Sequence, residues 1–205
     1  MNDYQTEQME TLTMIRSHFS EMGEAERKKL RASLKDYLAF RADTAAFLAG
    51  HFGHLCTRNC YENRMSACCS KDGIITFFAD AAVNVLLSSD AQLDALADVL
   101  VKTHTGFKCV YLSEKGCLWR IKPIVCEMFL CDSAKAEIFG NNPALKEEWE
   151  TLEKRRKGFT WPDRPVLFDE LEQIFLDAGY RSPLMYLHIS PGLLRIRRNS
   201  ARHPD

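Results

Sequence analysis

The sequence predicts a mainly α-helical protein with a small irregular cysteine-rich core and short β pieces. Three observations lead to this fold class. Apolar residues recur every three or four positions in the N-terminal and C-terminal parts of the chain, which is typical of amphipathic helices. Two further helices have strong capping signals at their starts. All eight cysteines lie between residues 56 and 131, in stretches with few helix signals.

Residues 1–53 are expected to form an N-terminal helical segment. An apolar stripe runs along it at spacings of three and four residues, which predicts one amphipathic helix through this stretch. Gly50 and Gly53 end the pattern. The stripe consists of Leu30, Leu34, Leu38, Ala42 and Ala45.

Residues 54–135 are expected to form a cysteine-cluster domain. Residues 54–73 contain Asn, Arg, Ser and a closing Asp-Gly, and this composition predicts irregular structure wrapped around a ligand. The run GIITFF at 73–78 is either a short strand or a buried connector, since it is too short to decide. A helix is expected over 126–139, just after a proline.

Two better-marked elements lie inside this domain. A helix is inserted near 89–102, because Ser89 and Gln92 fit a capping box in which each side chain satisfies a backbone donor of the first turn. Leu93, Leu96 and Leu100 belong to its apolar face. The β-prone runs FKCVYL and CLWRI flank the turn SEKG, which predicts short paired strands.

Residues 136–205 are expected to form a C-terminal helical segment. Asn142 and Pro143 are a good N-cap and first residue for one helix. Another helix starts near Pro165 and ends at Gly179. The basic tail RIRRNSARHPD is expected to fray.

Composition and charge narrow the class of protein. Hydrophobic residues make up 46% and charged residues 27%, as in globular proteins, and the formal net charge is -1. This charge argues against electrostatic binding to nucleic acid or membranes. The N-terminus lacks the basic and apolar regions of a signal peptide, and Asp80 and Asn84 interrupt the longest apolar run. The expected location is cytoplasmic, with no membrane association.

The cysteines form two clusters, and they are the strongest functional signal. Thiolates are soft ligands that suit Zn²⁺ and Fe–S clusters, whereas disulfides are rare in a reducing cytosol. Buried hydrophobic cysteines and a disulfide scaffold are weaker alternatives. The sequence therefore predicts a metal-binding core. The expected ligands are Cys56, Cys60, Cys68 and Cys69 in the first cluster, and Cys109, Cys117, Cys126 and Cys131 in the second.

The spacing leaves several ligand arrangements open. Eight thiols could fill two four-coordinate sites, or four could hold one cluster while the others serve structure or a second metal. Neither cluster has the spacing of a zinc ribbon or of a bacterial ferredoxin, so the two are expected to come together in space. Cys68 and Cys69 are adjacent, and their diverging side chains are expected to serve different partners.

The ordered set of cysteines resembles a known family. CxxxC is followed by a Cys-Cys pair, Cys-x-x-Leu, Gly-Cys, Pro-x-x-Cys and a closing Cys, over about residues 54–135. This order is similar to the zinc- or iron-chelating CxxCxxCC-type family, whose members are described as Fe–S-cluster-containing proteins. The chain departs from the family in its longer Cys60–Cys68 gap and in Lys122, where arginine is more typical. The resemblance implies a metal centre but no particular reaction.

The predicted function is binding of an Fe–S cluster or zinc, in the service of electron transfer or redox chemistry. A structural zinc module that presents its helices to a protein partner is one alternative. An enzyme with an open metal position, such as a metal-dependent modification enzyme, is the other. No catalytic residue is predicted. Nearby side chains are interpreted as structural histidines (His51, His54 and His104) and solvated carboxylates (Glu127 and Asp132).

Overall fold

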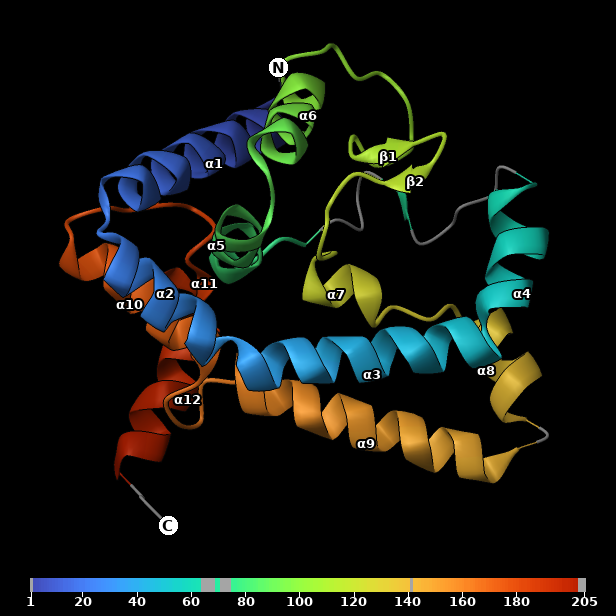
Figure 1. The fold of residues 1–205 in the computed structure, drawn as a ribbon. Helices are drawn as coiled ribbons and strands as arrows, with labels where there is room; N and C mark the ends of the chain where they lie inside the picture. Colours follow the sequence, from blue (N-terminus) through green and yellow to red (C-terminus); the bar gives the residue numbers. More distant parts are fainter. Residues whose placement is uncertain (1, 64–68, 71–74, 141, 203–205) are drawn as a thin grey trace.

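A computed structural model describes residues 2–63, 69–70, 75–140 and 142–202. The protein is 70% helical and 3% strand, which confirms the mainly α prediction. Figure 1 shows the arrangement of the elements. In chain order they are α1 Asp3–Glu21, α2 Glu24–Ser33, α3 Lys35–His51, α4 Gly53–Leu55, a π-helical turn Cys56–Tyr61, α5 Phe78–Leu87, α6 Asp90–Leu100, β1 Leu112–Ser113, β2 Gly116–Cys117, α7 Ile124–Glu127, α8 Asp132–Phe139, α9 Pro143–Thr160, α10 Leu167–Asp177, α11 Tyr186–Ile189 and α12 Pro191–Arg202.

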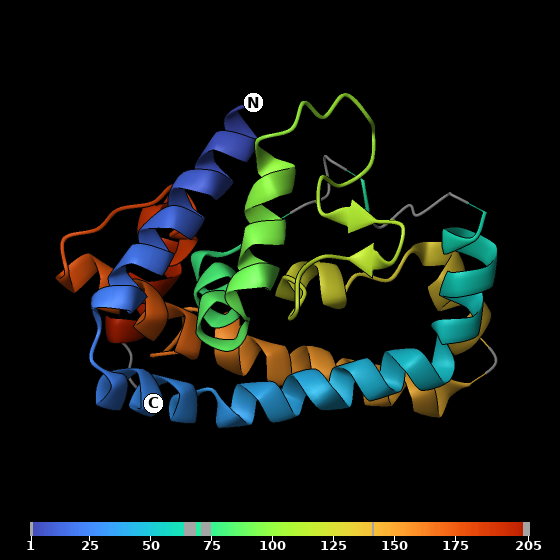
Figure 2. The same ribbon diagram turned by 45° about the horizontal axis from the view of Figure 1, so that its top comes forward.

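Helix α5 lies at the centre of the fold. It packs against α1, α2 and α10, and α1 also packs against α6 (Figure 2). Eight of its ten residues are buried, so it is apolar on nearly all sides and shows no amphipathic stripe. For residues 73–78 the sequence left a strand and a buried connector open. Residues 75–77, which the structure describes, form a connector without regular structure that leads into α5.

The predicted stripe through residues 30–45 is wrong in its second half. The chain breaks at Leu34, which is fully buried, and α2 and α3 are separate helices. Ala42 and Ala45 are exposed, whereas α3 buries Phe40 and Phe47. These rings stack on Phe159 and Trp149 of α9, at centroid distances of 5.3 and 5.6 Å. Aromatic side chains bury far more apolar area than alanine, so they decide which face turns inward.

The middle of the chain combines confirmed and wrong predictions. The capping box of α6 is present, and strands β1 and β2 pair antiparallel with Leu112 opposite Cys117. The predicted irregular stretch instead begins with helical turns, α4 and the π-helical turn. The single helix predicted over 126–139 is wrong, because the backbone of Cys131 is extended and serves as the N-cap of α8.

The C-terminal helices largely match the predictions. The Asn142 side chain accepts a hydrogen bond from the Leu145 backbone N–H, and α10 ends before Gly179, which has a positive φ of 88°. The tail prediction is wrong for its described part, since α12 extends to Arg202. Arg197 holds this helix to α10 by an ion pair of 2.8 Å with Asp169. Among the described helices, none is both long and apolar enough to span a membrane.

Candidate metal centre

Seven of the eight predicted ligands lie within the described residues, and Cys68 lies outside them. Cys56 and Cys60 are on the π-helical turn. Cys69 directly precedes Ser70, which forms an isolated β-bridge with Lys108. Cys109 lies just before strand β1, and Cys117 is in strand β2. Cys126 is in α7, and Cys131 is the N-cap of α8. Figure 1 shows these elements on the side of the molecule away from α1 and α2.

Backbone contacts join the two cysteine clusters. The Cys109 N–H donates to the Cys69 carbonyl at 2.7 Å, and Ser70 and Lys108 form an antiparallel bridge. The Tyr61 hydroxyl, one residue after Cys60, donates to the Glu114 carbonyl in the hairpin turn. Segments of the first cluster next to Cys60 and at Cys69 therefore contact the segment that carries Cys109 and Cys117, whereas a shared metal centre stays a prediction.

Thiols of the second cluster lie within electrostatic reach of one another and of Tyr4 and Tyr111. Burial raises the pKa of Cys109 to about 11, and the neighbouring Cys117 adds to this rise. Burial also raises the pKa of Cys117. Charges on Cys109 and Cys126 would both act on the Tyr4 hydroxyl. The raised pKa values favour the protonated forms of Cys109 and Cys117, whereas a bound metal ion would favour their thiolate forms.

Three buried hydrogen-bond donors on Tyr4, Gln8 and Trp119 have no partner among the described residues, and Tyr4 is the one within electrostatic reach of Cys109 and Cys126. The Tyr4 hydroxyl, Gln8 Nε2 and Trp119 Nε1 are buried and make no hydrogen bond within the described part of the chain. Thr76 lies near enough to Tyr4 to lower the pKa of its hydroxyl, yet the two groups do not reach hydrogen-bond geometry. Tyr111 connects this set, since its hydroxyl donates to Gln8 and its ring contacts Trp119 at 5.1 Å.

Unpaired donors of this kind indicate which chemical group would satisfy them. Each buried donor left unpaired costs about 1–3 kcal/mol. Metal-bound thiolates and cluster sulfides carry negative charge and accept such hydrogen bonds. The thiols of Cys109 and Cys126 and the Tyr4 hydroxyl are therefore chemically suited to a thiolate-bound metal and its hydrogen-bond donor.

The described side chains do not form a complete ligand set. Within residues 2–63, 69–70, 75–140 and 142–202, no three His, Cys, Asp or Glu side chains lie close enough to hold a metal ion together. Cys131 contacts the Ser133 hydroxyl at 3.2 Å, and Cys56 is exposed. The structure thus brings the segments together without closing all the thiols around one point.

The histidines near the clusters have structural contacts. His104 Nε2 lies 2.6 Å from the Lys108 carbonyl, and the His51 ring packs on Phe47 at 4.9 Å. His54 is exposed. The contacts of His104 and His51 agree with the expectation that these residues are structural rather than metal ligands.

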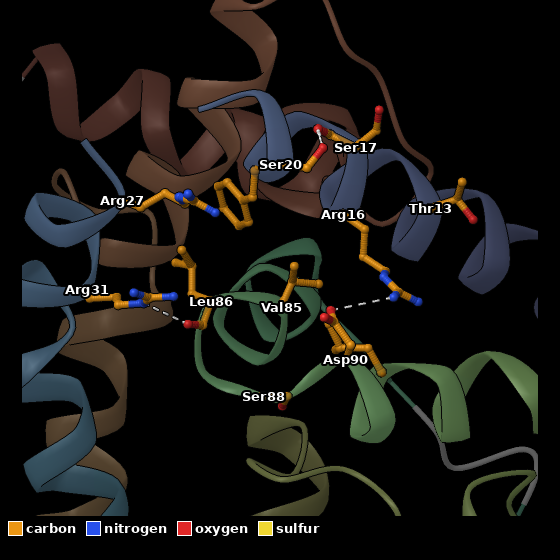
Figure 3. A pocket seen from close by; sticks show the side chains of 12 residues that line it. Thr13, Arg16, Ser17, Ser20, Arg27, Arg31, Val85, Leu86, Ser88 and Asp90 are labelled. Carbon is orange, nitrogen blue, oxygen red and sulfur yellow. Dashed lines mark hydrogen bonds and ion pairs between the residues drawn. The ribbon is translucent and has the colours of Figure 1, made fainter. Parts of the chain in front are cut away.

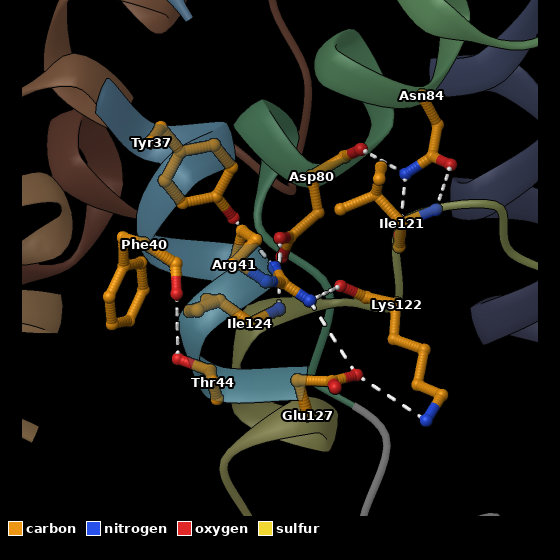
Figure 4. A network of polar contacts seen from close by, with 10 residues as sticks. All are labelled: Tyr37, Phe40, Arg41, Thr44, Asp80, Asn84, Ile121, Lys122, Ile124 and Glu127. Carbon is orange, nitrogen blue, oxygen red and sulfur yellow. Dashed lines mark hydrogen bonds and ion pairs between the residues drawn. The ribbon is translucent and has the colours of Figure 1, made fainter. Parts of the chain in front are cut away.

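The prediction that Glu127 is a solvated carboxylate is wrong. Its side chain is only 8% exposed, and its Oε2 lies 3.4 Å from Lys122 and 3.7 Å from Arg41 (Figure 4). Arg41 is itself buried and also donates to the Lys122 carbonyl and the Tyr37 hydroxyl. A buried carboxylate loses its hydration, and here the cationic side chains of Arg41 and Lys122 compensate for that loss.

A polar network holds the segment before Cys126 in place, and sequence reasoning missed it. Asn84 on α5 donates to the Ile121 carbonyl at 2.8 Å and accepts from the Ile121 N–H at 3.0 Å. The Asp80 carboxylate accepts from the Ile124 N–H at 3.0 Å, and burial raises its pKa to about 7. The missed signal is that Asp80 and Asn84 are four residues apart, so they share one face of an otherwise apolar helix.

No model of a known protein family matches this chain. Searches of curated proteins and of solved structures likewise gave no match.

Proposed function

We propose that the protein binds a metal centre, an Fe–S cluster or zinc, through its clustered cysteines where the two clusters meet. The observation that carries this proposal is the Tyr4 hydroxyl, which is buried without a hydrogen-bond partner among the described residues and lies within electrostatic reach of Cys109 and Cys126. The Cys69–Cys109 backbone contact supports it, because it joins segments that are about forty residues apart. The ordered cysteine motif and its family resemblance point to the same chemistry.

The protein's own residues would orient and shield such a centre. Tyr111 and Trp119 are buried and would limit the access of water, and Tyr4 would donate a hydrogen bond to a thiolate. An Fe–S cluster would supply one-electron transfer, whereas zinc would supply a structural cross-link. A full thiolate complement would leave no open position for a substrate, so it favours an electron-transfer or structural role over a catalytic one.

The first experiment is anaerobic purification followed by iron, zinc and sulfide analysis and visible absorption. An Fe–S protein is expected to be brown and to contain sulfide, whereas a zinc protein is colourless. Cys109→Ser and Cys69→Ser are expected to lower the metal content. Ser33→Ala, which changes an exposed residue at the end of α2 and keeps all eight thiols, serves as the control. A wild-type protein with no more metal than these cysteine variants would overturn the proposal.

The role of the unpaired donors has its own test. Tyr4→Phe removes one hydroxyl and keeps the ring and every thiol. We expect it to weaken metal affinity by about tenfold or more, measured by chelator competition, because outer-shell hydrogen bonds commonly contribute this much. Tyr180→Phe is the control, since Tyr180 packs on Phe175 and His18. Equal affinities for the two variants would mean that Tyr4 does not serve the centre.

A further inference from the structure

An open cavity of about 570 Å³ lies between α1, α2 and the turn from α5 to α6 (Figure 3). It is separate from the cysteine clusters, and no cysteine lines it. Its lining includes three arginines, Arg16, Arg27 and Arg31, and a single carboxylate, Asp90. An excess of guanidinium groups around a concave space favours an anionic ligand.

Two of the arginines are fixed by contacts with the protein. Arg31 Nε donates to the Leu86 carbonyl in the last turn of α5 at 2.9 Å, which leaves its two terminal nitrogens for other acceptors. Arg16 Nη1 pairs with Asp94 at 2.7 Å, while its Nη2 lies 3.8 Å from Asp90. The Asp90 side chain is 93% exposed, so this second contact is weak and easily replaced.

The third arginine has no such partner. Arg27 is half-buried at the cavity, and its guanidinium makes no hydrogen bond or ion pair with the part of the chain that the structure describes. It lies one turn before Arg31 on α2, so both side chains reach the same space from one side (Figure 3). Arg16 reaches it from α1 on the other side.

Neutral groups complete the cavity. Thr13, Ser17 and Ser20 line the cavity from α1, where the Ser17 and Ser20 hydroxyls donate to the Glu21 carboxylate and the Ser17 carbonyl, and Val85 and Leu86 supply apolar contact from α5. Ser88 in the α5–α6 turn also lines the cavity.

We propose that this cavity binds a small organic phosphate. A phosphate dianion matches the excess of positive charge better than a single carboxylate, and it offers several acceptor oxygens to guanidinium groups that reach the cavity from two sides. The volume is that of a site for a small molecule, and the apolar contacts of Val85 and Leu86 would cover a nonpolar part of the ligand.

The test is to titrate the protein with inorganic phosphate, pyrophosphate and adenosine monophosphate. Binding is measured by isothermal titration calorimetry and by backbone NMR. We expect saturable binding that is tighter for adenosine monophosphate than for inorganic phosphate, with shifts confined to α1, α2 and the α5–α6 turn. Acetate at the same concentrations separates phosphate recognition from general attraction of carboxylates.

Matched variants distinguish this site from surface charge. Arg27→Gln is expected to weaken binding by about tenfold or more, the size of one lost charge-assisted contact. It should leave the fold intact, because Arg27 supports no other described group. Lys28→Gln and Lys29→Gln remove the same charge from exposed positions of α2 that do not line the cavity, and they should bind normally. Non-saturable binding, or equal losses in Arg27→Gln and Lys29→Gln, would overturn the proposal.

Discussion

Glu172 and His188 form a buried polar pair between α10 and α11. His188 Nδ1 lies 2.7 Å from Glu172 Oε2, and Arg197 Nη1 lies 2.7 Å from His188 Nε2. Because Arg197 can only donate, the ring proton is on Nδ1, which donates to Glu172. Asp169 faces the same ring at 3.4 Å, and Arg181 acts on it from farther away.

The pair predicts that stability falls as the pH rises above neutrality. Burial raises the pKa of Glu172 to about 8, so the folded protein keeps a proton that the unfolded chain releases near pH 4.5. The resulting stability is present below pH 4.5 and is lost as the pH rises towards 8. Burial lowers the pKa of His188 below its ordinary value of 6.5. This group alone would make the stability rise with pH, and its effect ends near pH 6.5, where the unfolded histidine has lost its proton. The net loss is therefore expected between about pH 6.5 and 8, at no more than about 1.4 kcal/mol per pH unit.

Glu172→Gln tests this slope. Glutamine keeps an acceptor for Nδ1 but cannot ionise, so urea unfolding of the variant should depend less on pH across the same window. Glu170→Gln changes an exposed carboxylate on the same helix and should retain the wild-type slope. A wild-type protein whose stability is flat from pH 6.5 to 8 would contradict the prediction.

At the scale of elements, Asn84 connects the central helix to the segment that leads to Cys126. Asn84→Ala would leave the Ile121 N–H and carbonyl without their partner, so we expect a loss of about 2 kcal/mol in urea unfolding. Metal affinity should fall as well, because the segment before Cys126 loses its anchor. Ser89→Ala removes only the N-cap of α6, and it should cost about 1 kcal/mol and leave metal affinity unchanged. Equal metal affinities in all three proteins would show that Asn84 does not position the site.

The elements that the sequence predicts well are those with local signals. The N-caps Ser89 and Asn142 lie within three residues of the groups that they satisfy, so the starts of α6 and α9 can be recognised from short stretches. Helix α5 lacks such a signal, because neighbours on several sides cover it and erase its periodicity. Arg41 has one local partner, Tyr37, but its partners Lys122 and Glu127 lie more than eighty residues away, and no local pattern reveals them. The cysteine motif predicts which thiols to consider, but the unpaired donors of Tyr4 and Trp119 emerge only from tertiary packing.

At the scale of the whole molecule, one hydrophobic core unites helices from all parts of the chain. Helices α5 and α6 lie between the two cysteine clusters in sequence, yet they pack against α1 and α10. Removal of metal is therefore expected to loosen the hairpin and its flanks while the helical core persists. Hydrogen exchange after chelation under reducing conditions should be faster at the amides of Cys109 and Leu118 and unchanged at Val83. Uniform loss of protection, α5 included, would contradict this division.

The contact between Cys69 and Cys109 also has a consequence for chain entropy. It closes a loop of about forty residues that contains α5 and α6. Backbone hydrogen bonds close this loop only in the folded state, whereas metal–thiolate bonds across the same point would restrict the unfolded chain too. A permanent cross-link around a loop of this length removes conformational freedom equivalent to about 4 kcal/mol. A metal at this point would then stabilise the packing of α5 against α1 without touching either helix.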